Sequence, residues 1–144
     1  MTASIWKKPV TAQAINTIHI DTAVSHLGIE FMEVGADHMV ARMPVDRRTL
    51  QPYGRLHGGA MVLLAETLVS CGANYGASEG QVAVGLEINA NHLRAARSGH
   101  VTGTCRPVHV GRSTQVWQVE IRDDAGALCC VARMTAALVD QATG

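Results

Sequence analysis

One acidic residue, Glu66, stands alone in a long stretch of apolar and small residues that runs from Gly58 to Ala77. The stretch is too long for an ordinary strand, and its alanine and leucine content favours a helix. A helix that is apolar on nearly every side is expected to be buried, where a carboxylate is costly unless something uses or satisfies it. Glu66 is therefore a candidate general base or nucleophile. The alternative is a structural carboxylate paired with an arginine or a histidine.

Helical geometry predicts which polar groups accompany Glu66. Ser70 lies at i+4 and shares its face, whereas His57 and Gly58 lie at the helix N-terminus. Unpaired backbone N–H groups and the positive end of the helix dipole favour negative charge there. The glycines at 58 and 59 let a ligand approach the backbone closely, so the Gly58 amide is a candidate donor to a developing oxyanion. His57 is a candidate for orienting a substrate, and a plain turn before a helix is the alternative.

Length and composition predict one domain, residues 1–144. Formal net charge is zero, so the chain lacks the basic excess of a nucleic-acid-binding protein. The four cysteines form no CxxC pair and the seven histidines are dispersed, which predicts reduced thiols in a cytoplasmic protein and no metal site. The N-terminus has no apolar signal region, and no stretch is long and apolar enough to span a membrane without a charge.

The segments before the central helix are predicted to be short. An amphipathic helix over Pro9–Ile20, capped by Thr11, precedes another helical turn at Asp21–His26. Two strands joined by a tight turn follow, at Gly28–Val34 and His38–Val45. Apolar residues alternate along the second strand, which predicts that one of its faces is buried.

A polar loop leads into the central helix, and four long strand patterns follow it. The loop contains Gln51, a candidate site residue because loops held against a rigid element often carry function. Short connections between the strand patterns predict consecutive antiparallel hairpins, and Pro107 predicts a bulge. The patterns are Val82–Asn91, His100–Val110, Thr114–Arg122 and Ala127–Val139. The prediction is an α+β domain in which a curved antiparallel sheet of five or six strands wraps one long helix and leaves edges to pair with a second copy.

The stretch from Ile88 to Val119 contains no acidic residue, yet it holds four arginines and three histidines. A solvated basic face is one interpretation, and a site for an anionic ligand is the other. The turn His109–Thr114 combines backbone N–H groups, hydroxyls and a guanidinium, which suits phosphate. Neither a Walker loop nor a GxGxxG motif is present, so a nucleotide-binding fold is disfavoured, and there is no GxSxG nucleophile elbow.

Two strings in the sequence carry a resemblance to a known family. The first is Gln51-Pro-Tyr-Gly-Arg-Leu-His57-Gly58-Gly59-Ala60, with Ala65-Glu66 and Ser70 downstream; the second is Val84-Gly85-Leu86-Glu87-Ile88-Asn89-Ala90-Asn91-His92. Together they strongly resemble the hotdog-fold acyl-CoA thioesterases. The branch is the one containing the menaquinone-pathway 1,4-dihydroxy-2-naphthoyl-CoA hydrolase, the enterobactin-pathway proofreading thioesterase and an aromatic 4-hydroxybenzoyl-CoA thioesterase. The resemblance covers nearly the whole chain.

The resemblance implies hydrolysis of acyl-CoA thioesters, particularly aromatic ones, with CoA as part of the substrate and no cofactor. Glu66 would be the nucleophile or general base, the Gly58 amide and helix dipole would polarise the carbonyl, and Ser70 would hold the attacking water. His57 and Gln51 would position the substrate. The residues implied to meet CoA are Gly85, His92, Arg94, Ala95, His109, Gly111, Arg112, Ser113 and Thr114. The implied assembly is a homodimer or a dimer-of-dimers tetramer with the site between subunits.

The chemistry of a thioester agrees with this resemblance. A thiolate leaves with a conjugate-acid pKa near that of cysteine, about 8.5, so hydrolysis needs no strong general acid. It needs a base or nucleophile, an oxyanion donor and a water. Two alternatives stay open: a hotdog hydratase or dehydratase acting on a 3-hydroxyacyl thioester, and a non-catalytic acyl-CoA-binding module. Asn74 stands where some relatives carry an aromatic residue, so the acyl group itself is open, as is the choice between a covalent anhydride and direct attack of water.

Overall fold

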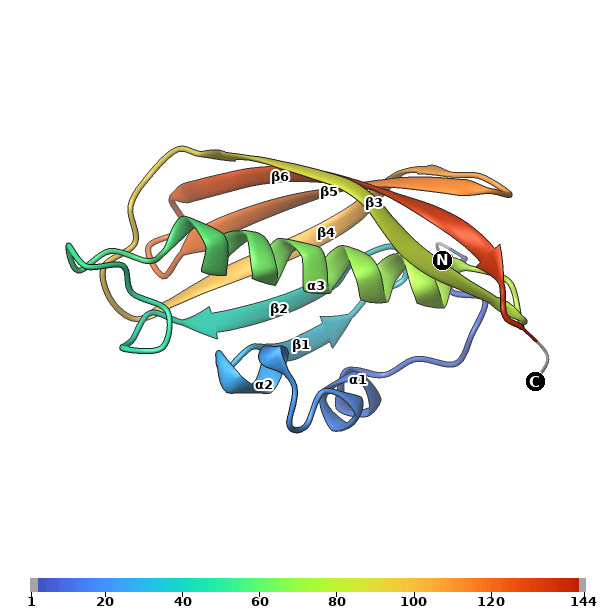
Figure 1. Cartoon of the computed structure of the whole chain (residues 1–144), viewed down its shortest axis with the longest axis horizontal. Helices are drawn as coiled ribbons and strands as arrows, with labels where there is room; N and C mark the ends of the chain where they lie inside the picture. The colour runs from blue at the N-terminus through green and yellow to red at the C-terminus, as the bar shows by residue number, and fades with distance from the viewer. Residues whose placement is uncertain (1–2, 143–144) are drawn as a thin grey trace.

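A curved sheet and one long helix dominate the computed structural model of the chain, which describes residues 3–142. The helices are α1 (Ala12–Ile18), α2 (Ala23–His26) and α3 (Gly58–Gly76). The strands are β1 (Glu30–Val34), β2 (Met39–Pro44), β3 (Gln81–His92), β4 (His100–Val110), β5 (Thr114–Asp123) and β6 (Leu128–Asp140). All neighbouring strands pair antiparallel in one six-stranded sheet of order β1-β2-β4-β5-β6-β3. The sheet curves around α3 (Figure 1), which confirms the predicted α+β architecture.

One predicted connection is wrong, because β3 and β4 do not form a hairpin. β3 pairs with β6 instead, and its last residue, His92, lies opposite Cys130. The chain then crosses the end of the sheet to reach His100, and on the way the Leu93 N–H donates to the Cys129 carbonyl at 2.7 Å. Since β6 occupies the place beside β5, β3 becomes an edge strand, and its second edge has no partner strand in residues 3–142.

The remaining hairpins form as predicted, and alternation along β5 supplies the centre of the core. The residues of β5 that are fully buried are Gln115, Trp117, Val119 and Ile121. Trp6 lies nearly parallel to Trp117, with ring centroids 5.9 Å apart, and its indole N–H donates to the Gly35 carbonyl at 2.7 Å. Pro107 lies at the predicted bulge, where the register of β4 shifts between Pro107 and His109.

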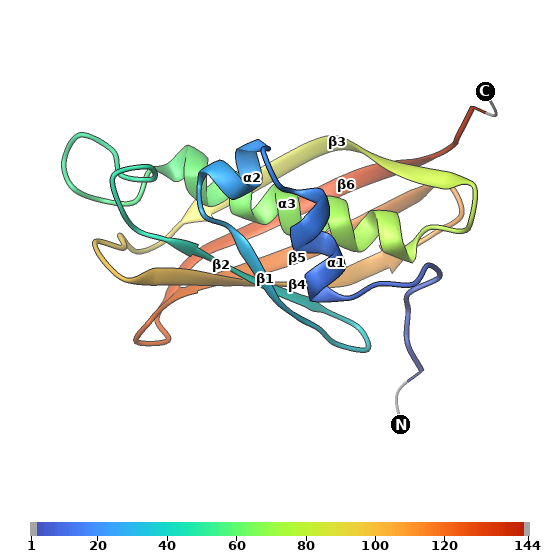
Figure 2. The ribbon, with the colours of Figure 1, turned by 90° about the horizontal axis from the view of Figure 1, so that it is seen from below.

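The N-terminal helices are shorter than predicted but are firmly anchored. Thr11 caps α1 as expected, accepting a hydrogen bond from the Ala14 N–H at 3.1 Å. The side-chain amide of Asn16 donates to the Phe31 carbonyl at 3.0 Å and accepts from the Phe31 N–H at 2.8 Å. These two bonds fix α1 to β1, so that α1 and α2 lie beside α3 (Figure 2).

Three predictions drawn from composition can be compared with the described residues. All four cysteines are free and buried, as expected of structural thiols. Within residues 3–142, no cluster of histidine, cysteine, aspartate or glutamate side chains has the size and arrangement needed for a metal ion. In the same part of the chain, none of the helices has the length and apolar character required to cross a membrane.

Candidate active site

One face of α3 is left open by the sheet, and Glu66 lies in the middle of it. Glu66 is exposed in the single chain, and Ser70 and Asn74 farther along the same face are half-buried. The expectation of a helix buried on nearly every side, with Glu66 inside it, is therefore wrong for one chain. Glu66 forms no ion pair with any of residues 3–142, so a structural salt bridge does not explain it either.

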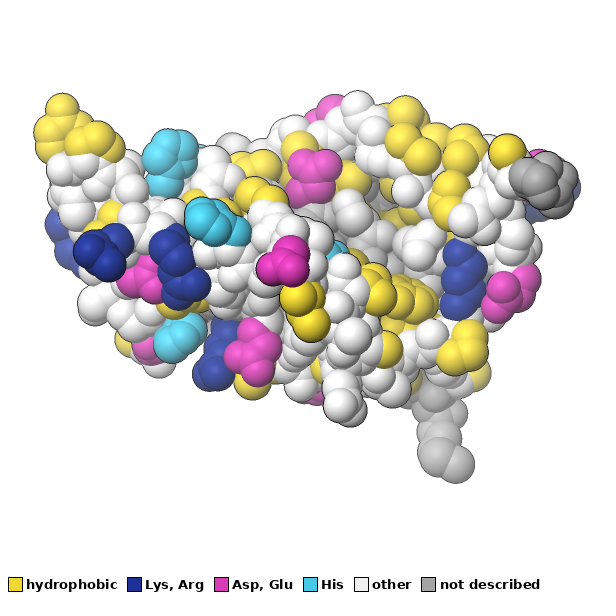
Figure 3. Space-filling model, turned by 60° about the horizontal axis from the view of Figure 1, so that its bottom comes forward, with side chains coloured by type: hydrophobic (Ala, Val, Ile, Leu, Met, Phe, Trp, Pro, Cys, Tyr) yellow, Lys and Arg dark blue, Asp and Glu magenta, His cyan; other side chains and the backbone are white. Residues whose placement is uncertain are grey.

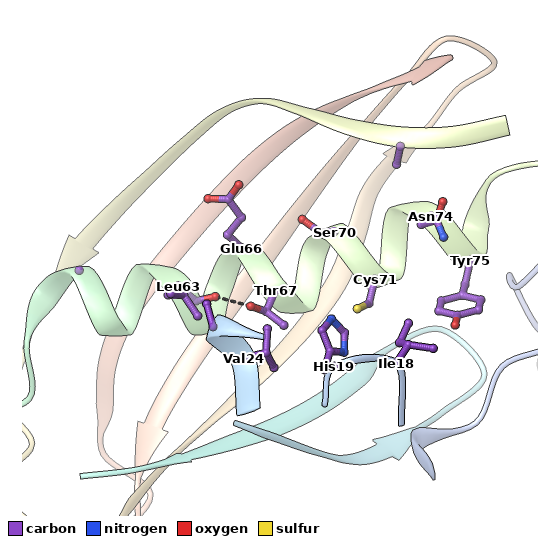
Figure 4. A pocket seen from close by; sticks show the side chains of 13 residues that line it. Ile18, His19, Val24, Leu63, Glu66, Thr67, Ser70, Cys71, Asn74 and Tyr75 are labelled. Atoms are coloured by element: carbon purple, nitrogen blue, oxygen red, sulfur yellow. Dashed lines mark hydrogen bonds between the residues drawn. The ribbon is translucent and has the colours of Figure 1, made fainter. Parts of the chain in front are cut away.

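A pocket of about 640 Å³ opens along this face of α3. Its walls come from α1, α2, α3 and the start of β3, and Figure 3 shows a hollow bordered by hydrophobic side chains on this side of the molecule. In Figure 4, Glu66 and Ser70 project from α3 toward β3, whereas Val24, His19 and Ile18 approach α3 from the other side. Most of the pocket's surface is apolar, which suits the hydrocarbon part of a ligand.

β3 passes very close to the carboxylate. A Cβ built on Gly85 would lie 3.6 Å from Oε1 of Glu66 and 2.5 Å from Cε of Met134. A side chain at this position would therefore displace the methionine and crowd the carboxylate. Gly85 was predicted to meet CoA, and the structure places it beside the group expected to attack the thioester.

A thiol also lines the pocket, but it is not a competing nucleophile. Burial raises the pKa of Cys71 to about 12. Because the thiolate is the nucleophilic form of cysteine, Cys71 stays protonated and inert near neutral pH. Among residues 3–142, Glu66 is the only carboxylate that lines this pocket.

The N-terminus of α3 forms a separate part of the site. His57 is the N-cap, and its Nδ1 accepts a hydrogen bond from the Gly59 N–H at 2.8 Å. Gly58 is the first helical residue, where a backbone N–H has no intrahelical acceptor. A Cβ on Gly58 would lie 3.1 Å from Nε2 of His92, so the histidine of β3 stands against this amide. Within residues 3–142 the Gly58 N–H has no hydrogen-bond acceptor, so it remains a candidate donor to a ligand oxygen.

A second pocket, of about 370 Å³, gathers several predicted site residues around this helix end. They are Gln51, Gly58, His92, Arg94 and Ala95. The Gln51 side-chain oxygen accepts hydrogen bonds from the N–H groups of Tyr53 and Arg55, so it is folded into its own loop. The Gln51 side chain therefore contacts the backbone of its own loop rather than Glu66.

The turn between β4 and β5 holds a third group of predicted site residues, distant in sequence from Glu66 and from the N-terminus of α3. Gly111 and Arg112 line a pocket of about 510 Å³ together with Lys7 and Asp140. One backbone N–H and one carbonyl of this turn are already used, since the Gly111 N–H donates to the Thr114 carbonyl at 2.9 Å and the Ser113 carbonyl accepts from the Leu138 N–H at 2.8 Å. The basic stretch thus does not form one patch.

Arg106 also lies apart from the other arginines of the basic stretch. Its guanidinium pairs with Asp37 at 2.9 Å on the surface of β4, away from the pockets that hold Arg94 and Arg112. This ion pair and a hydrogen bond from His38 hold the pKa of the Asp37 carboxyl below its usual value, the histidine having the larger effect. Within residues 3–142 of a single chain, Arg94, Arg106 and Arg112 therefore line three different pockets.

Residues of the two short N-terminal helices were not predicted to belong to the site. Ile18, His19, Ala23 and Val24 line the large pocket. Ile18 is 62% exposed, whereas Ile15 is fully buried. The sequence signal was present, because α1 has more apolar residues than one buried stripe requires.

Comparison with known proteins identifies the family of this site. Residues 53–130 match the family model described as the thioesterase superfamily. The 1,4-dihydroxy-2-naphthoyl-CoA hydrolase of Escherichia coli is 52% identical over 94% of this chain and 99% of its own length. The proofreading thioesterase EntH of Cronobacter turicensis is 47% identical over 94% of this chain and 98% of its own length.

Solved structures agree with the sequence relatives. A thioesterase of Haemophilus influenzae superposes with a TM-score of 0.94 at 47% identity, covering 97% of this chain and 99% of that one. A mutant thioesterase of Pseudomonas aeruginosa has a TM-score of 0.93 at 41% identity, covering 96% of this chain and 100% of that one. The hotdog fold expected from the motifs is confirmed. With a family model matched over more than half of its residues and relatives of this identity along nearly its whole length, the chain belongs to the thioesterase superfamily.

Proposed function

We propose that this enzyme hydrolyses the thioester bond of aromatic acyl-CoA substrates, with Glu66 as the attacking group or the base that activates water. The observation that carries the proposal is a carboxylate without an ion-pair partner in residues 3–142, placed at the wall of a largely apolar pocket of about 640 Å³. Ser70 lies one turn farther along the same face and is suited to hold the water. The relative named 1,4-dihydroxy-2-naphthoyl-CoA hydrolase supports an aromatic acyl group.

The chemical step can be written from these groups. As a base, Glu66 takes a proton from water, and the oxygen forms a bond to the thioester carbon. As a nucleophile, its carboxylate forms that bond itself and water then cleaves the resulting anhydride. In both routes the C–S bond breaks and its electron pair leaves with CoA sulfur, which is a good leaving group without a strong acid. The Gly58 N–H would stabilise the oxyanion, and the chemistry requires no cofactor.

The distance between Gly58 and Glu66 indicates that one chain does not complete the site. Eight residues of α3 separate them, which corresponds to about 12 Å along the helix axis. One thioester carbonyl cannot accept a hydrogen bond from the Gly58 N–H while its carbon is attacked from Glu66 of the same chain. We therefore propose that the oxyanion donor facing Glu66 is Gly58 of the partner subunit in a homodimer, and that the remaining predicted CoA-binding residues act across the same boundary.

The unpaired edge of β3 is the surface through which we propose that two copies meet. Its side chains Val84 and Leu86 are 48% and 63% exposed, which is unusual for apolar residues in the middle of a long strand. Antiparallel pairing of two such edges about a two-fold axis would extend the sheet and satisfy the unpaired backbone groups. The two α3 helices would then run in opposite directions, with the N-terminus of one approaching the middle of the other.

The decisive experiment measures thiol release from 1,4-dihydroxy-2-naphthoyl-CoA, hydroxybenzoyl-CoA and a medium-chain acyl-CoA by wild type and Glu66→Gln. The amide has nearly the shape of the carboxylate but neither attacks nor accepts a proton, so we expect the aromatic esters to be cleaved fastest and the variant to lose roughly 10³-fold or more in kcat. Equal rates in variant and wild type would refute the role of Glu66. Hydration of a crotonyl thioester without thiol release would instead support a hydratase, and binding without turnover would support a binding module.

A further inference from the structure

One polar side chain in the wall of the large pocket has no part in the hydrolysis described above. His19 follows the last residue of α1 and is the pocket-lining residue that brings a nitrogen heterocycle to an otherwise apolar wall, between Ile18 and Val24. In Figure 4 its ring lies below α3 and is directed toward Thr67 and Cys71. The ring is half-buried, so it is accessible from the cavity.

The ring of His19 is held in one orientation by two contacts. Nδ1 lies 2.8 Å from the Ile15 carbonyl, and the ring stacks on Phe31 with 8° between the planes and 6.1 Å between the centroids. Phe31 is itself joined to α1 by the two hydrogen bonds of Asn16. A side chain fixed in this way costs little further entropy when it binds a ligand.

The contact with Ile15 also determines what the second nitrogen offers. A carbonyl oxygen can only accept, so Nδ1 must carry the proton of this hydrogen bond. Nε2 is then an acceptor in the neutral ring and a donor in the charged ring. Within residues 3–142, the only hydrogen bond of this side chain is the one through Nδ1, which leaves Nε2 for a ligand.

The donor of the neighbouring Thr67 hydroxyl is already in use. The Thr67 hydroxyl, which lies close to His19 in Figure 4, donates to the Leu63 carbonyl at 2.7 Å. Ser70 projects from the other side of α3, beside Glu66. A group on the acyl chain that reaches the wall between Ile18 and Val24 therefore meets His19 as its polar partner.

We propose that His19 selects acyl groups that carry a hydroxyl, by a hydrogen bond between that hydroxyl and Nε2. A hydroxyl both donates and accepts, so it pairs with the ring in either protonation state. An apolar acyl group of the same size leaves Nε2 without a partner once water is displaced, which penalises its binding. This inference rests on the proposed thioesterase function and adds a specificity residue to it.

The test compares benzoyl-CoA with the three monohydroxybenzoyl-CoA isomers, using wild type, His19→Leu and His19→Gln. We expect wild type to prefer one hydroxylated isomer, and His19→Leu to reduce that ratio of kcat/KM roughly threefold to tenfold, the range for one hydrogen bond. His19→Gln should restore part of the ratio, because its amide can still pair with a hydroxyl. Ile18→Ala is the matched control: it removes pocket wall without a polar atom, so it should change all four substrates by a similar factor.

A second readout separates this inference from the thioesterase function. Calorimetric titration of Glu66→Gln, with and without His19→Leu, measures the affinity of the intact thioesters when no hydrolysis occurs. Loss of the hydroxyl preference in both assays supports the role of His19. If His19→Leu lowers every substrate equally or changes no ratio, the role is refuted while a rate loss in Glu66→Gln leaves the thioesterase function standing. Hydroxyl-selective binding by a protein that releases no thiol would support His19 and refute the hydrolysis.

Discussion

The indole ring of Trp117 lies directly against the backbone of Gly72. A Cβ built on Gly72 would fall 2.9 Å from Cζ3 and 3.0 Å from Cη2 of that ring. Trp117 is fully buried, so it has no room to withdraw. The absence of a side chain at Gly72 is what lets α3 approach the sheet closely at this point.

Gly72→Ala should therefore destabilise the fold by about 1–3 kcal/mol, the usual cost of overpacking a core. Thermal unfolding followed by circular dichroism would show it as a lowered Tm. Gly76→Ala is the matched control, because the nearest atoms to a Cβ there are 3.7–3.8 Å away. That substitution should be neutral or slightly stabilising, since alanine is the better helix former. Equal effects of both changes would contradict the close contact.

Gln115 is a fully buried polar residue with one hydrogen bond to α3 and one to its neighbour in β5, Trp117. Its amide nitrogen donates to the Ala73 carbonyl at 3.3 Å, and its oxygen accepts from the Trp117 indole at 2.7 Å. Gln115→Leu should cost about 1–3 kcal/mol, because it leaves the indole N–H buried without an acceptor. Chemical denaturation measures the loss. The double variant Gln115→Leu with Trp117→Phe removes the orphaned N–H as well, and its loss should be smaller than the sum of the two single losses.

The order of elements and the buried faces could be predicted from the sequence, because alternation and turn residues are local signals. The alternation of β2 and β5 predicts their buried faces correctly, and Thr11 and Pro107 mark a cap and a bulge. The partner of β3 could not be predicted in this way. Which strand pairs with β3 depends on interactions across the whole sheet. Strands that are neighbours in the sequence are often, but not always, neighbours in the sheet.

Some features of the candidate site could likewise be predicted from the sequence, and others could not. The motif predicts Glu66, Ser70 and Gly58 correctly as residues of one helix, and the structure places the first two in the large pocket. It could not predict that Glu66 is exposed in the single chain, because exposure depends on how far β3 and α1 stand from α3. His19 was missed because its role depends on a ring orientation that only the folded contacts reveal.

A single substitution can remove the backbone N–H of Gly58 while disturbing the helix little. Proline has no N–H and is well tolerated at the first position of a helix, and His57 already has the extended conformation that precedes proline. Gly58→Pro should lower kcat by roughly 10²–10³-fold, as expected for loss of one oxyanion donor. Gly58→Ala keeps the N–H while adding a similar Cβ near His92, so it should retain most of the activity. Comparable losses in the two variants would point to crowding instead of the amide.

A site shared between two copies predicts complementation between two inactive variants. Chains carrying Glu66→Gln and chains carrying Gly58→Pro are given different affinity tags, produced together and purified through both tags. Each mixed dimer then has one site with both defects and one with neither, so it should recover roughly half of the wild-type turnover per dimer. Mixed dimers as inactive as their parents would show that Glu66 and Gly58 act within one chain.

Two buried thiols predict a loss of stability at alkaline pH. Burial raises the pKa of Cys71 and of Cys105 from the ordinary thiol value of 9.0 to about 12. Because the folded state keeps these protons while the unfolded state loses them, the stabilisation is complete below pH 9 and is lost as the pH rises toward 12. Each thiol contributes a slope of about 1.4 kcal/mol per pH unit in that window. Urea unfolding at several pH values should show a shallower decline for Cys105→Ala than for wild type; parallel curves would refute this.

The pairing of β3 with β6 determines when during synthesis the enzyme can become functional. β3 is made directly after α3, yet its partner strand is the last of the sheet. Closing so long a loop costs chain entropy before any contact compensates for it, so β3 docks late. Until β6 has left the ribosome, Gly85 is not held beside Glu66, and the part of α3 that β3 and β6 cover stays open. Unfinished chains therefore expose the pocket-lining helix to chaperones and to aggregation, and they release no thiol.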